Sequence, residues 1–252
     1  MQPKQSGRTR LDELLVARGH FATRSRARDA IERGTVSVGG ATVVKPGLAV
    51  APDAAVAVDD PAARYVSRAA LKLAAGLDLF GLSPAGKVAL DIGASTGGFT
   101  QVLLERGAVR VFAVDVGHGQ MDAGLRADPR IACIEGLNAR DLAPADLGGA
   151  RPDFVVSDVS FISLTLALPP ALDLAAAGAL AIFLVKPQFE AGRAAIGKGG
   201  LLKDPEDGPR IARRLRDWLD RQPGWRAVGL EPSPVPGGDG NREFLLAGAK
   251  AP

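Results

Sequence analysis

The sequence predicts an α/β fold with an open, mostly parallel sheet, preceded by a small basic α+β domain. Strand-like apolar segments alternate with helix-like segments over residues 61–252, which predicts the larger domain. Within it, Val88–Thr100 leads from a strand into a glycine-rich loop. The charge is uneven, because residues 1–50 hold nine Lys/Arg against four Asp/Glu and the rest of the chain holds 22 against 24. A basic domain over residues 1–60 indicates a polyanionic partner.

Two helices, a β-hairpin and a short final strand are expected in the basic domain. Thr9 and Asp12 fit a capping box for the first helix, and Thr23 fits the N-cap of the second, which Gly34 ends. The dipeptide Gly39-Gly40 joins two alternating segments and is typical of a hairpin turn.

Six arginines of this domain are candidates for binding nucleic acid, because a guanidinium matches the geometry of a phosphate. They are Arg10, Arg18, Arg24, Arg26, Arg28 and Arg33. A solvated helix face is the alternative explanation. The segments RLDELLVARG, SRARDAIERGTVSVGG and KPG resemble the small RNA-binding domain of a small-subunit ribosomal protein and of several RNA-modifying enzymes. This resemblance covers residues 8–58 and implies binding to structured RNA through shape and phosphates.

The larger domain is expected to begin near Tyr65 with a helix that Ser67 caps, that runs through Leu79 and that Gly81 closes. Alternating strands and helices follow. The predicted strands are 88–91, 109–114, 131–135, 153–157, 179–185, 226–231 and 242–248. The predicted helices are 98–106, 119–126, 165–177 and 206–221.

The glycine-rich loop predicts a site for a cofactor that contains a nucleoside. Gly93 and Gly97 are four residues apart, so the loop lacks the dinucleotide pattern G-x-G-x-x-G, which argues against a NAD-dependent dehydrogenase. The next strand ends on Asp115, 24 residues after Asp91. An acid at that place can accept hydrogen bonds from ribose hydroxyls.

Two charged residues follow other apolar strands, Asp158 and Lys186. Because the carboxyl ends of parallel strands meet at one edge of a sheet, both are expected beside the cofactor loop. Lys72 on the preceding helix and Glu243 at the start of a late strand are, taken alone, equally typical of surface residues.

Composition excludes several classes of protein. The single cysteine, Cys133, rules out an internal disulfide, and with only two histidines it argues against a metal site. The longest apolar stretch, 164–185, contains Pro169-Pro170 and Asp173, which argues against a membrane span of about 20 residues. The N-terminus has no apolar segment typical of a secretion signal. A cytoplasmic protein with neither a metal nor a membrane partner is expected.

The larger domain resembles the RrmJ/FtsJ-type ribose methyltransferases. The chain as a whole resembles the TlyA family, whose members are named both hemolysins and ribosomal RNA 2′-O-methyltransferases. The matching segments are YVSRAALKL, ALDIGASTGGFT, VDVGHGQ, SDVSFISL, VKPQFE, GKGG and GNREFLL. The resemblance implies a Rossmann-like class I methyltransferase that uses S-adenosyl-L-methionine and acts on ribosomal RNA or ribosomal subunits. No obligate protein partner is indicated.

The resemblance also implies the residues of the site. The family's catalytic Lys-Asp-Lys-Glu set carries over as Lys72, Asp158, Lys186 and Glu243, although Ala69-Ala70 replaces two glycines that are usual in the family. The residues expected around the cofactor are Asp91, Gly93, Ser95, Thr96, Gly97, Gly98 and Phe99 near its methionine part, Asp115 at its ribose and Asn138 near its adenine. Ser160-Phe161 replaces the Asn/Asp-Pro-Pro-aromatic signature of many base N-methyltransferases, which favours oxygen as the methyl acceptor.

A ribose hydroxyl is a weak nucleophile, so its methylation needs a base or a stabiliser of the developing negative charge. Lys186 is the candidate, as a base if it is a neutral amine and as a stabiliser if it is an ammonium. The sequence leaves this choice open. Two other functions also stay open, a membrane-active hemolysin and a non-catalytic RNA-binding factor of ribosome assembly.

Overall fold

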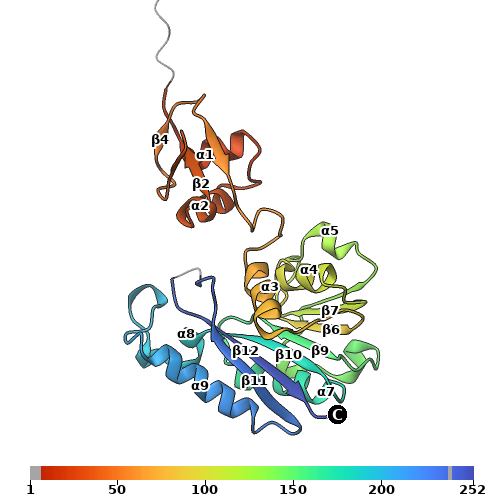
Figure 1. Ribbon diagram of the computed structural model, residues 1–252. Coiled ribbons are helices and arrows are strands. Elements are labelled where there is room, and N and C mark those ends of the chain that lie inside the picture. The colour runs from red at the N-terminus through yellow and green to blue at the C-terminus, as the bar shows by residue number, and fades with distance from the viewer. Residues whose placement is uncertain (1–6, 238–239) are drawn as a thin grey trace, which may run out of the picture. The chain divides into compact units, whose positions relative to one another are not determined.

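The computed structural model describes residues 7–237 and 240–252. They form two compact units, and the boundary between them lies between Arg64 and Tyr65 (Figure 1). The sequence predicts this boundary four residues earlier, between residues 60 and 61. Each unit has its own apolar core and is described by itself.

The N-terminal unit packs two helices against short strands. The helices are α1 (Leu11–Ala17) and α2 (Arg24–Glu32). The strands are β1 (Thr9–Arg10) and β4 (Ala49–Val50), which pair antiparallel, and β2 (Val36–Val38), β3 (Ala41–Thr42) and β5 (Val56–Val58), which form a sheet in the order β3-β2-β5. The antiparallel pair of β2 and β3 is the predicted hairpin.

One predicted helix cap of this unit is confirmed and the other is wrong. The backbone N–H of Arg26 donates to Thr23 Oγ1 at 3.3 Å at the start of α2. Thr9 lies in β1, and α1 starts after Arg10 without a side-chain cap. Asp12 does not complete a capping box because its buried carboxylate accepts from the Arg10 guanidinium at 3.0 Å. A carboxylate removed from water needs such a partner to offset its lost hydration.

The C-terminal unit is built on a seven-stranded sheet in the order β11-β12-β10-β9-β6-β7-β8. Its strands are β6 (Val88–Ile92), β7 (Arg110–Asp115), β8 (Ile131–Glu135), β9 (Phe154–Ser157), β10 (Leu180–Val185), β11 (Trp225–Pro232) and β12 (Phe244–Lys250). The strands β6 to β10 pair in parallel, and β12 runs antiparallel to both β10 and β11. The predicted Rossmann-like α/β fold is confirmed.

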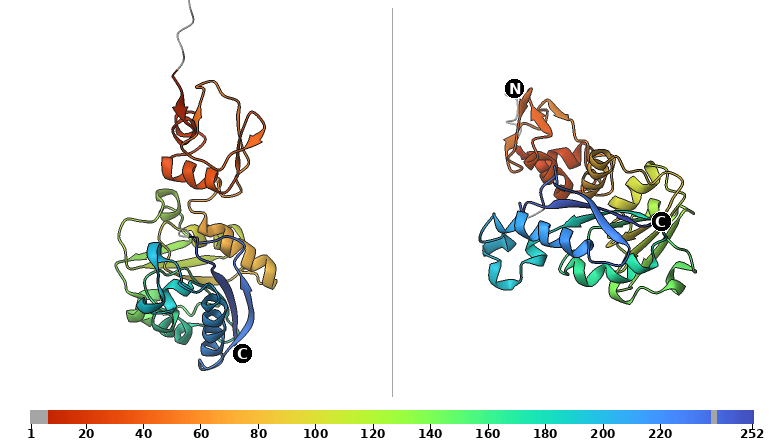
Figure 2. Two further views of the ribbon diagram at one scale, coloured as in Figure 1. Left: turned by 90° about the vertical axis from the view of Figure 1, so that its left-hand side faces the viewer. Right: turned by 60° about the horizontal axis from the view of Figure 1, so that its bottom comes forward.

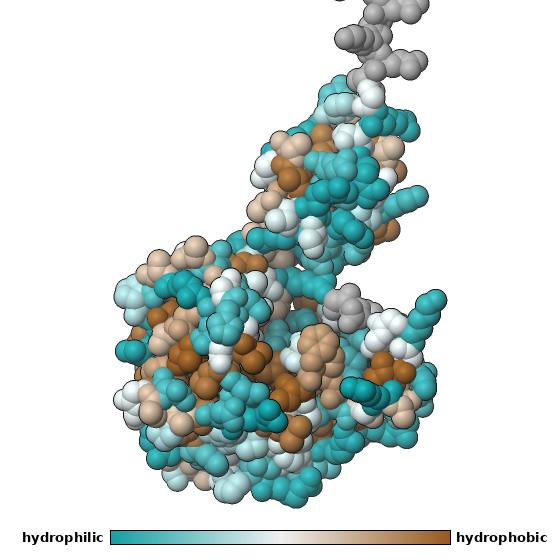
Figure 3. All heavy atoms as spheres, turned by 180° about the vertical axis from the view of Figure 1, so that it is seen from behind, coloured by the Kyte–Doolittle hydropathy of each residue, from teal (hydrophilic) through white to brown (hydrophobic). Residues whose placement is uncertain are grey.

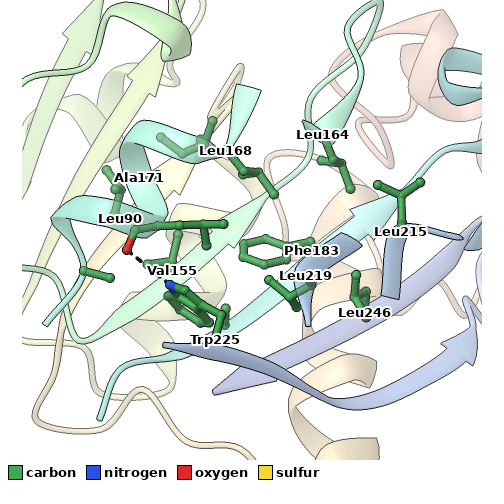
Figure 4. Packing of buried hydrophobic residues seen from close by; sticks show 14 of the residues in the cluster. Leu90, Val155, Leu164, Leu168, Ala171, Phe183, Leu215, Leu219, Trp225 and Leu246 are labelled. Carbon is green, nitrogen blue, oxygen red and sulfur yellow. Dashed lines mark hydrogen bonds between the residues drawn. The ribbon is translucent and has the colours of Figure 1, made fainter. Parts of the chain in front are cut away.

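Helices cover both faces of this sheet (Figure 2). On one face lie α3 (Ala69–Phe80) and α4 (Gly98–Glu105), and on the other lie α6 (Leu164–Ala167), α7 (Pro169–Leu174) and α9 (Asp207–Leu219). Neighbouring strand residues point to opposite cores, so Ile182 packs under α3 and Phe183 packs under α9. In the second core, Trp225 Nε1 donates to the carbonyl oxygen of Leu172 at 3.2 Å (Figure 4).

Local chemistry explains where the helices differ from those predicted. The helix expected over 165–177 is divided into α6 and α7, because Pro169-Pro170 has no N–H to continue the hydrogen-bond ladder. The helix expected over 119–126 is reduced to α5 (Ala123–Arg126), which begins where the Asp122 carboxylate accepts from two backbone N–H groups. The short helices absent from the prediction are α8 (Pro187–Glu190) and four 3-10 turns, Ala139–Asp141, Pro144–Leu147, Arg193–Ala195 and Lys198–Gly200.

Candidate active site

The glycine-rich loop follows β6 and passes very close to its neighbours. Gly93 has a φ of 85°, and a Cβ there would lie 3.0 Å from Val159 Cγ1 and 3.1 Å from the carbonyl oxygen of Asp158. Gly97 has a φ of 97°, and its Cβ would lie 2.5 Å from Leu125 Cδ1. Conformation therefore favours glycine at both positions, and at Gly93 the nearby backbone also leaves little space for a Cβ.

Two adjoining cavities lie beside this loop. On the face of this unit seen in Figure 3, apolar residues gather at the surface. The larger has a volume of about 730 Å³, and its lining includes residues 114–116, 137–140 and 158–162. The smaller has a volume of about 150 Å³, and its lining includes Ser67, Phe99 and Lys186. The larger volume is in the range of small-molecule sites.

Most of the residues predicted to bind the cofactor line these cavities. Those in the larger cavity are Gly93, Ser95, Asp115 and Asn138. Those in the smaller cavity are Gly93, Ser95, Thr96, Gly98 and Phe99. Asp91 and Gly97 line neither, because Asp91 is fully buried and Gly97 packs against Leu125.

Asp115 is the last residue of β7, and its carboxylate accepts hydrogen bonds from backbone N–H groups, including one of the glycine-rich loop. Its Oδ2 accepts from the backbone N–H of Ser95 at 2.8 Å, and its Oδ1 accepts from that of Gly117 at 2.7 Å. Each carboxylate oxygen can accept more than one hydrogen bond, so Asp115 can also receive a ribose hydroxyl.

Asp91 is a buried carboxyl with an unused acceptor. Thr100 Oγ1 donates to its Oδ2 at 2.6 Å, whereas its Oδ1 has no hydrogen-bond partner among the described residues. Burial raises the pKa of Asp91 to about 7, against the lowering effect of the Thr100 hydrogen bond, and the negative charges of Asp158 and Asp115 add to the rise.

The four predicted catalytic residues form two ion pairs. Lys186 Nζ lies 2.7 Å from Asp158 Oδ1 and donates to Ser160 Oγ at 2.8 Å. Lys72 Nζ donates to Glu243 Oε2 at 2.5 Å, and these two residues are only 5% and 3% exposed. Lys186 and Asp158 line the smaller cavity, and the other pair is buried outside its lining.

The register of the sheet brings these residues to one edge. Val185 of β10 faces Phe244 of β12. Lys186 directly follows Val185 and Glu243 directly precedes Phe244, so the two charged residues leave adjacent strands at the same end. Asp158 follows β9, the parallel neighbour of β10 on its other side.

Phe161 belongs to this site although the sequence assigned it no role. Its side chain is 90% exposed, its φ is 65°, and its ring lies 4.9 Å from that of Phe189, centroid to centroid. A left-handed φ is costly for an aromatic residue and indicates a functional constraint. The signal in the sequence was a large aromatic residue directly after Ser160, in a segment of strand-end polar residues.

A family model described as FtsJ-like methyltransferase matches residues 65–250, which is most of the chain. The chain belongs to the FtsJ-like methyltransferases. A model of the S4 domain matches residues 9–56 of this methyltransferase, the segment with the predicted RNA-binding helices. Its methyl donor is S-adenosyl-L-methionine.

Relatives match this FtsJ-like methyltransferase over nearly its whole length. It is 45% identical to the "16S/23S rRNA (cytidine-2'-O)-methyltransferase TlyA" of Mycobacterium tuberculosis, over 95% of this chain and 89% of that protein. It is 39% identical to "Hemolysin A" of Brachyspira hyodysenteriae, over 94% of this chain and 98% of that protein. A solved structure described as a candidate hemolysin from Streptococcus thermophilus covers 98% of this chain and 90% of its own, with a TM-score of 0.75 and 38% identity. The resemblance to the TlyA family is confirmed.

Three of the arginines predicted to bind RNA form ion pairs inside the S4 domain of this methyltransferase. Arg10 and Arg24 contact the buried Asp12 carboxylate at 3.0 and 3.2 Å. Arg33 contacts Asp60 at 2.7 Å, and its side chain is only 18% exposed. These contacts give the three arginines a structural role.

The other three arginines differ in their contacts. Arg18 donates to two backbone carbonyl oxygens, at 2.5 and 2.7 Å, and Arg26 donates to that of Ala63 at 3.5 Å. Arg28 is exposed and, within the part of the chain that the structure describes, makes no hydrogen bond or ion pair. Over residues 7–237 and 240–252, no helix of this FtsJ-like methyltransferase is both long enough and apolar enough to cross a bilayer.

Proposed function

We propose that this chain transfers a methyl group from S-adenosyl-L-methionine to a ribose 2′-oxygen of ribosomal RNA. The nucleotide we propose is a cytidine, the one in the name of the Mycobacterium tuberculosis relative. The observation that carries the proposal is the position of Lys186, which follows β10 at the wall of the smaller cavity and pairs with Asp158 at 2.7 Å.

The two cavities fit the two ends of the cofactor. Asp115 and Asn138 would hold the ribose and the adenine in the larger cavity, and the glycine-rich loop would hold the methionine part beside the smaller one. When bound, the cofactor supplies an electrophilic methyl group on a sulfonium. The task of the protein is then to place a ribose oxygen in line with that methyl group.

Lys186 is placed to act on that oxygen. An ammonium has three N–H donors, of which one is donated to Ser160 Oγ, and its charge forms an ion pair with Asp158 at 2.7 Å. We assign a further donor to the ribose 2′-oxygen. There the positive charge would stabilise the negative charge that develops while the hydroxyl proton is lost to water, the new O–C bond forms, and the S–C bond of the methyl donor breaks to leave S-adenosylhomocysteine.

The buried pair of Lys72 and Glu243 would fix the rim of the site. A Cβ at Gly237 would lie 2.6 Å from Glu243 Oε1, so the segment after β11 packs directly on this carboxylate. Since Glu243 and Lys186 leave neighbouring strands at the same end, a fixed Glu243 keeps the surroundings of Lys186 constant.

Phe161 would bind the base of the target nucleotide. Enzymes that modify RNA commonly stack unpaired bases on aromatic side chains. The exposed ring of Phe161 follows Ser160, which accepts from Lys186 Nζ at 2.8 Å. A base stacked on this ring would therefore bring its own ribose toward Lys186.

The S4 domain would bind the structured RNA around the target, through phosphates more than through bases. Among the six predicted arginines, Arg28 makes no hydrogen bond or ion pair with the described residues, so its whole guanidinium is open to such a contact. A ribosomal substrate places the enzyme in the cytoplasm. No feature of the described residues favours a lytic function, although one relative is named a hemolysin.

The test uses purified protein, tritiated S-adenosyl-L-methionine and ribosomal subunits from cells that lack this protein. We expect tritium in ribosomal RNA at a ribose whose 3′ phosphodiester resists alkaline cleavage, and none with Lys186→Ala. Label on a base, or no label on either subunit, would contradict the proposal.

A further inference from the structure

Helix α8 and the residue before it contact the loop 159–164 through three side chains. Lys186, which precedes α8, donates to Ser160 Oγ at 2.8 Å. The ring of Phe189 in α8 lies 4.9 Å from that of Phe161, centroid to centroid. The last residue of α8, Glu190, binds the far end of the loop.

Glu190 makes two of these contacts. Its Oε2 accepts from Ser163 Oγ at 2.6 Å, and its Oε1 accepts from the backbone N–H of Leu164 at 2.7 Å. Leu164 is the first residue of α6, and a backbone N–H at a helix start has no partner within its own helix. Hydrogen bonds to an ionised carboxylate are about twice as strong as neutral ones.

Glu190 is also bound through its backbone to α9. Arg214 Nη2, on α9, donates to the backbone carbonyl oxygen of Glu190 at 2.7 Å. The contact therefore links the loop 159–164 through α8 to a helix of the second core.

The loop needs such a restraint because of where it lies and how it is folded. Residues 158–162 line the larger cavity, and Ser160 also lines the smaller one beside Lys186. Phe161 in the middle of the loop has a φ of 65°, a conformation that persists only where the surrounding contacts enforce it. Both ends of this strained segment are bound to the α8 region, by Lys186 at one end and by Glu190 at the other.

We propose that Glu190 is a positioning residue for methyl transfer, which fixes Ser160 and Phe161 relative to Lys186 by anchoring the loop through Ser163 and Leu164. This inference rests on the function proposed above. Glu190 touches neither cavity and both of its carboxylate oxygens are in use, so it acts through the loop.

The test compares Glu190→Ala with Glu190→Gln, because glutamine keeps one carbonyl acceptor for the loop. We expect Glu190→Ala to lower kcat on ribosomal subunits roughly 10- to 100-fold, the effect of a small misplacement of reacting groups. KM for the subunits should change much less, and Glu190→Gln should restore most of kcat. A purely structural role would lower the melting temperature of both variants without this separation of kcat from KM. Glu105→Ala, which removes an exposed carboxylate from the end of α4, is the matched control.

A double-variant cycle and a binding measurement complete the test. If Glu190 acts through Ser163, the pair Glu190→Ala and Ser163→Ala should cost no more kcat than Glu190→Ala alone. Calorimetry with S-adenosylhomocysteine should show weaker binding by Glu190→Ala, because the loop lines the cofactor cavity. This readout needs no RNA, so it stays informative if wild-type protein methylates no ribosomal RNA, the outcome that refutes the proposed function alone. Wild-type kcat and wild-type affinity in Glu190→Ala would overturn the positioning role.

Discussion

Lys186 Nζ and Asp158 Oδ1 lie 2.7 Å apart at the ends of two neighbouring parallel strands. Their separation is set by the hydrogen-bonded pairing of β9 with β10. In the proposed mechanism Asp158 would also have an electrostatic role, because the cofactor would bring a positive charge into a site that already contains Lys186. Without this carboxylate the two cations would repel each other.

Replacing Lys186 with alanine should reduce methyl transfer by roughly 100-fold or more, since it removes the charge that stabilises the reacting oxygen. Binding of S-adenosylhomocysteine should stay within about twofold, because the loop and Asp115 are unchanged. Single-turnover kinetics and calorimetry measure the two effects. Lys87→Ala is the matched control, because Lys87 precedes β6 at the opposite edge of the sheet. Near-normal transfer by Lys186→Ala would remove this lysine from the mechanism.

Breaking the buried pair of Lys72 and Glu243 should cost stability as well as activity. Lys72→Met leaves a buried carboxylate without its partner, which typically costs about 3–5 kcal/mol in the free energy of unfolding. The double variant with Glu243→Leu should recover much of that stability and remain inactive. Urea unfolding measured beside methyl transfer separates the two effects, and an active double variant would show that the charges are not required.

Asp91 should make the protein less stable as the pH rises. Its pKa is about 7 in the folded state and near the ordinary value of 3.8 in the unfolded state, so between these values the folded state binds more protons. The free energy of unfolding therefore decreases from about pH 4 to pH 7, by about 1.4 kcal/mol for each pH unit in that range. Asp91→Asn should lack this decrease. Urea unfolding of both proteins at several pH values measures the difference, and parallel curves would contradict the prediction.

Phe161→Ala should weaken use of the RNA substrate without unfolding the protein. Loss of one base–aromatic stack costs about 1–3 kcal/mol, which corresponds to a 5- to 150-fold loss in kcat/KM for ribosomal subunits. Phe161→Tyr should restore most of it, because the ring is exposed and a hydroxyl has room. Phe161→Gly should lose kcat/KM to at least the same extent as Phe161→Ala and be at least as stable as wild type, since glycine adopts a φ of 65° without strain. A fully active alanine variant would exclude the stacking role.

Alanine substitutions of Arg28 and Arg33 should have different effects on RNA binding and on stability, although both residues are predicted to bind RNA. Arg28→Ala removes an exposed cation and should weaken RNA binding, with the salt dependence reduced by about one unit of slope. Arg33→Ala breaks the contact with Asp60, so it should chiefly lower the melting temperature. Filter binding at several salt concentrations and thermal unfolding distinguish them. Equal effects of both variants on the salt slope would contradict this division of roles.

The sequence predicted the sheet and the edge of the site well, because apolar periodicity and strand-end charges are local patterns. The contact of Asp158 with Lys186 follows from two parallel strands that end together. The pairing of Lys72 with Glu243 came only from the family resemblance, since no local pattern relates residues on α3 and β12.

Features that depend on tertiary contacts were missed. Thr9 fitted a helix cap locally, but β1 pairs with β4 and Asp12 is taken by arginines. The loop conformation of Phe161 and the role of Glu190 arise from contacts between segments about 27 residues apart. Burial, which changes the pKa of Asp91, is likewise a property of the folded unit and not of its sequence neighbours.

The order of strands has a consequence for synthesis of the protein. β12 is the last strand in the chain, yet it lies inside the sheet between β10 and β11. While β12 is still within the ribosome, no strand lies between β10 and β11. At that stage Lys72 also lacks its ion-pair partner, Glu243, which lies 171 residues later in the chain. The cofactor loop and β6 to β9 can form earlier during translation, but the completed catalytic edge appears only after β12 has emerged. If the proposed catalytic set is correct, a nascent chain would lack Glu243 and its contact with Lys72 until this part of the chain has been made.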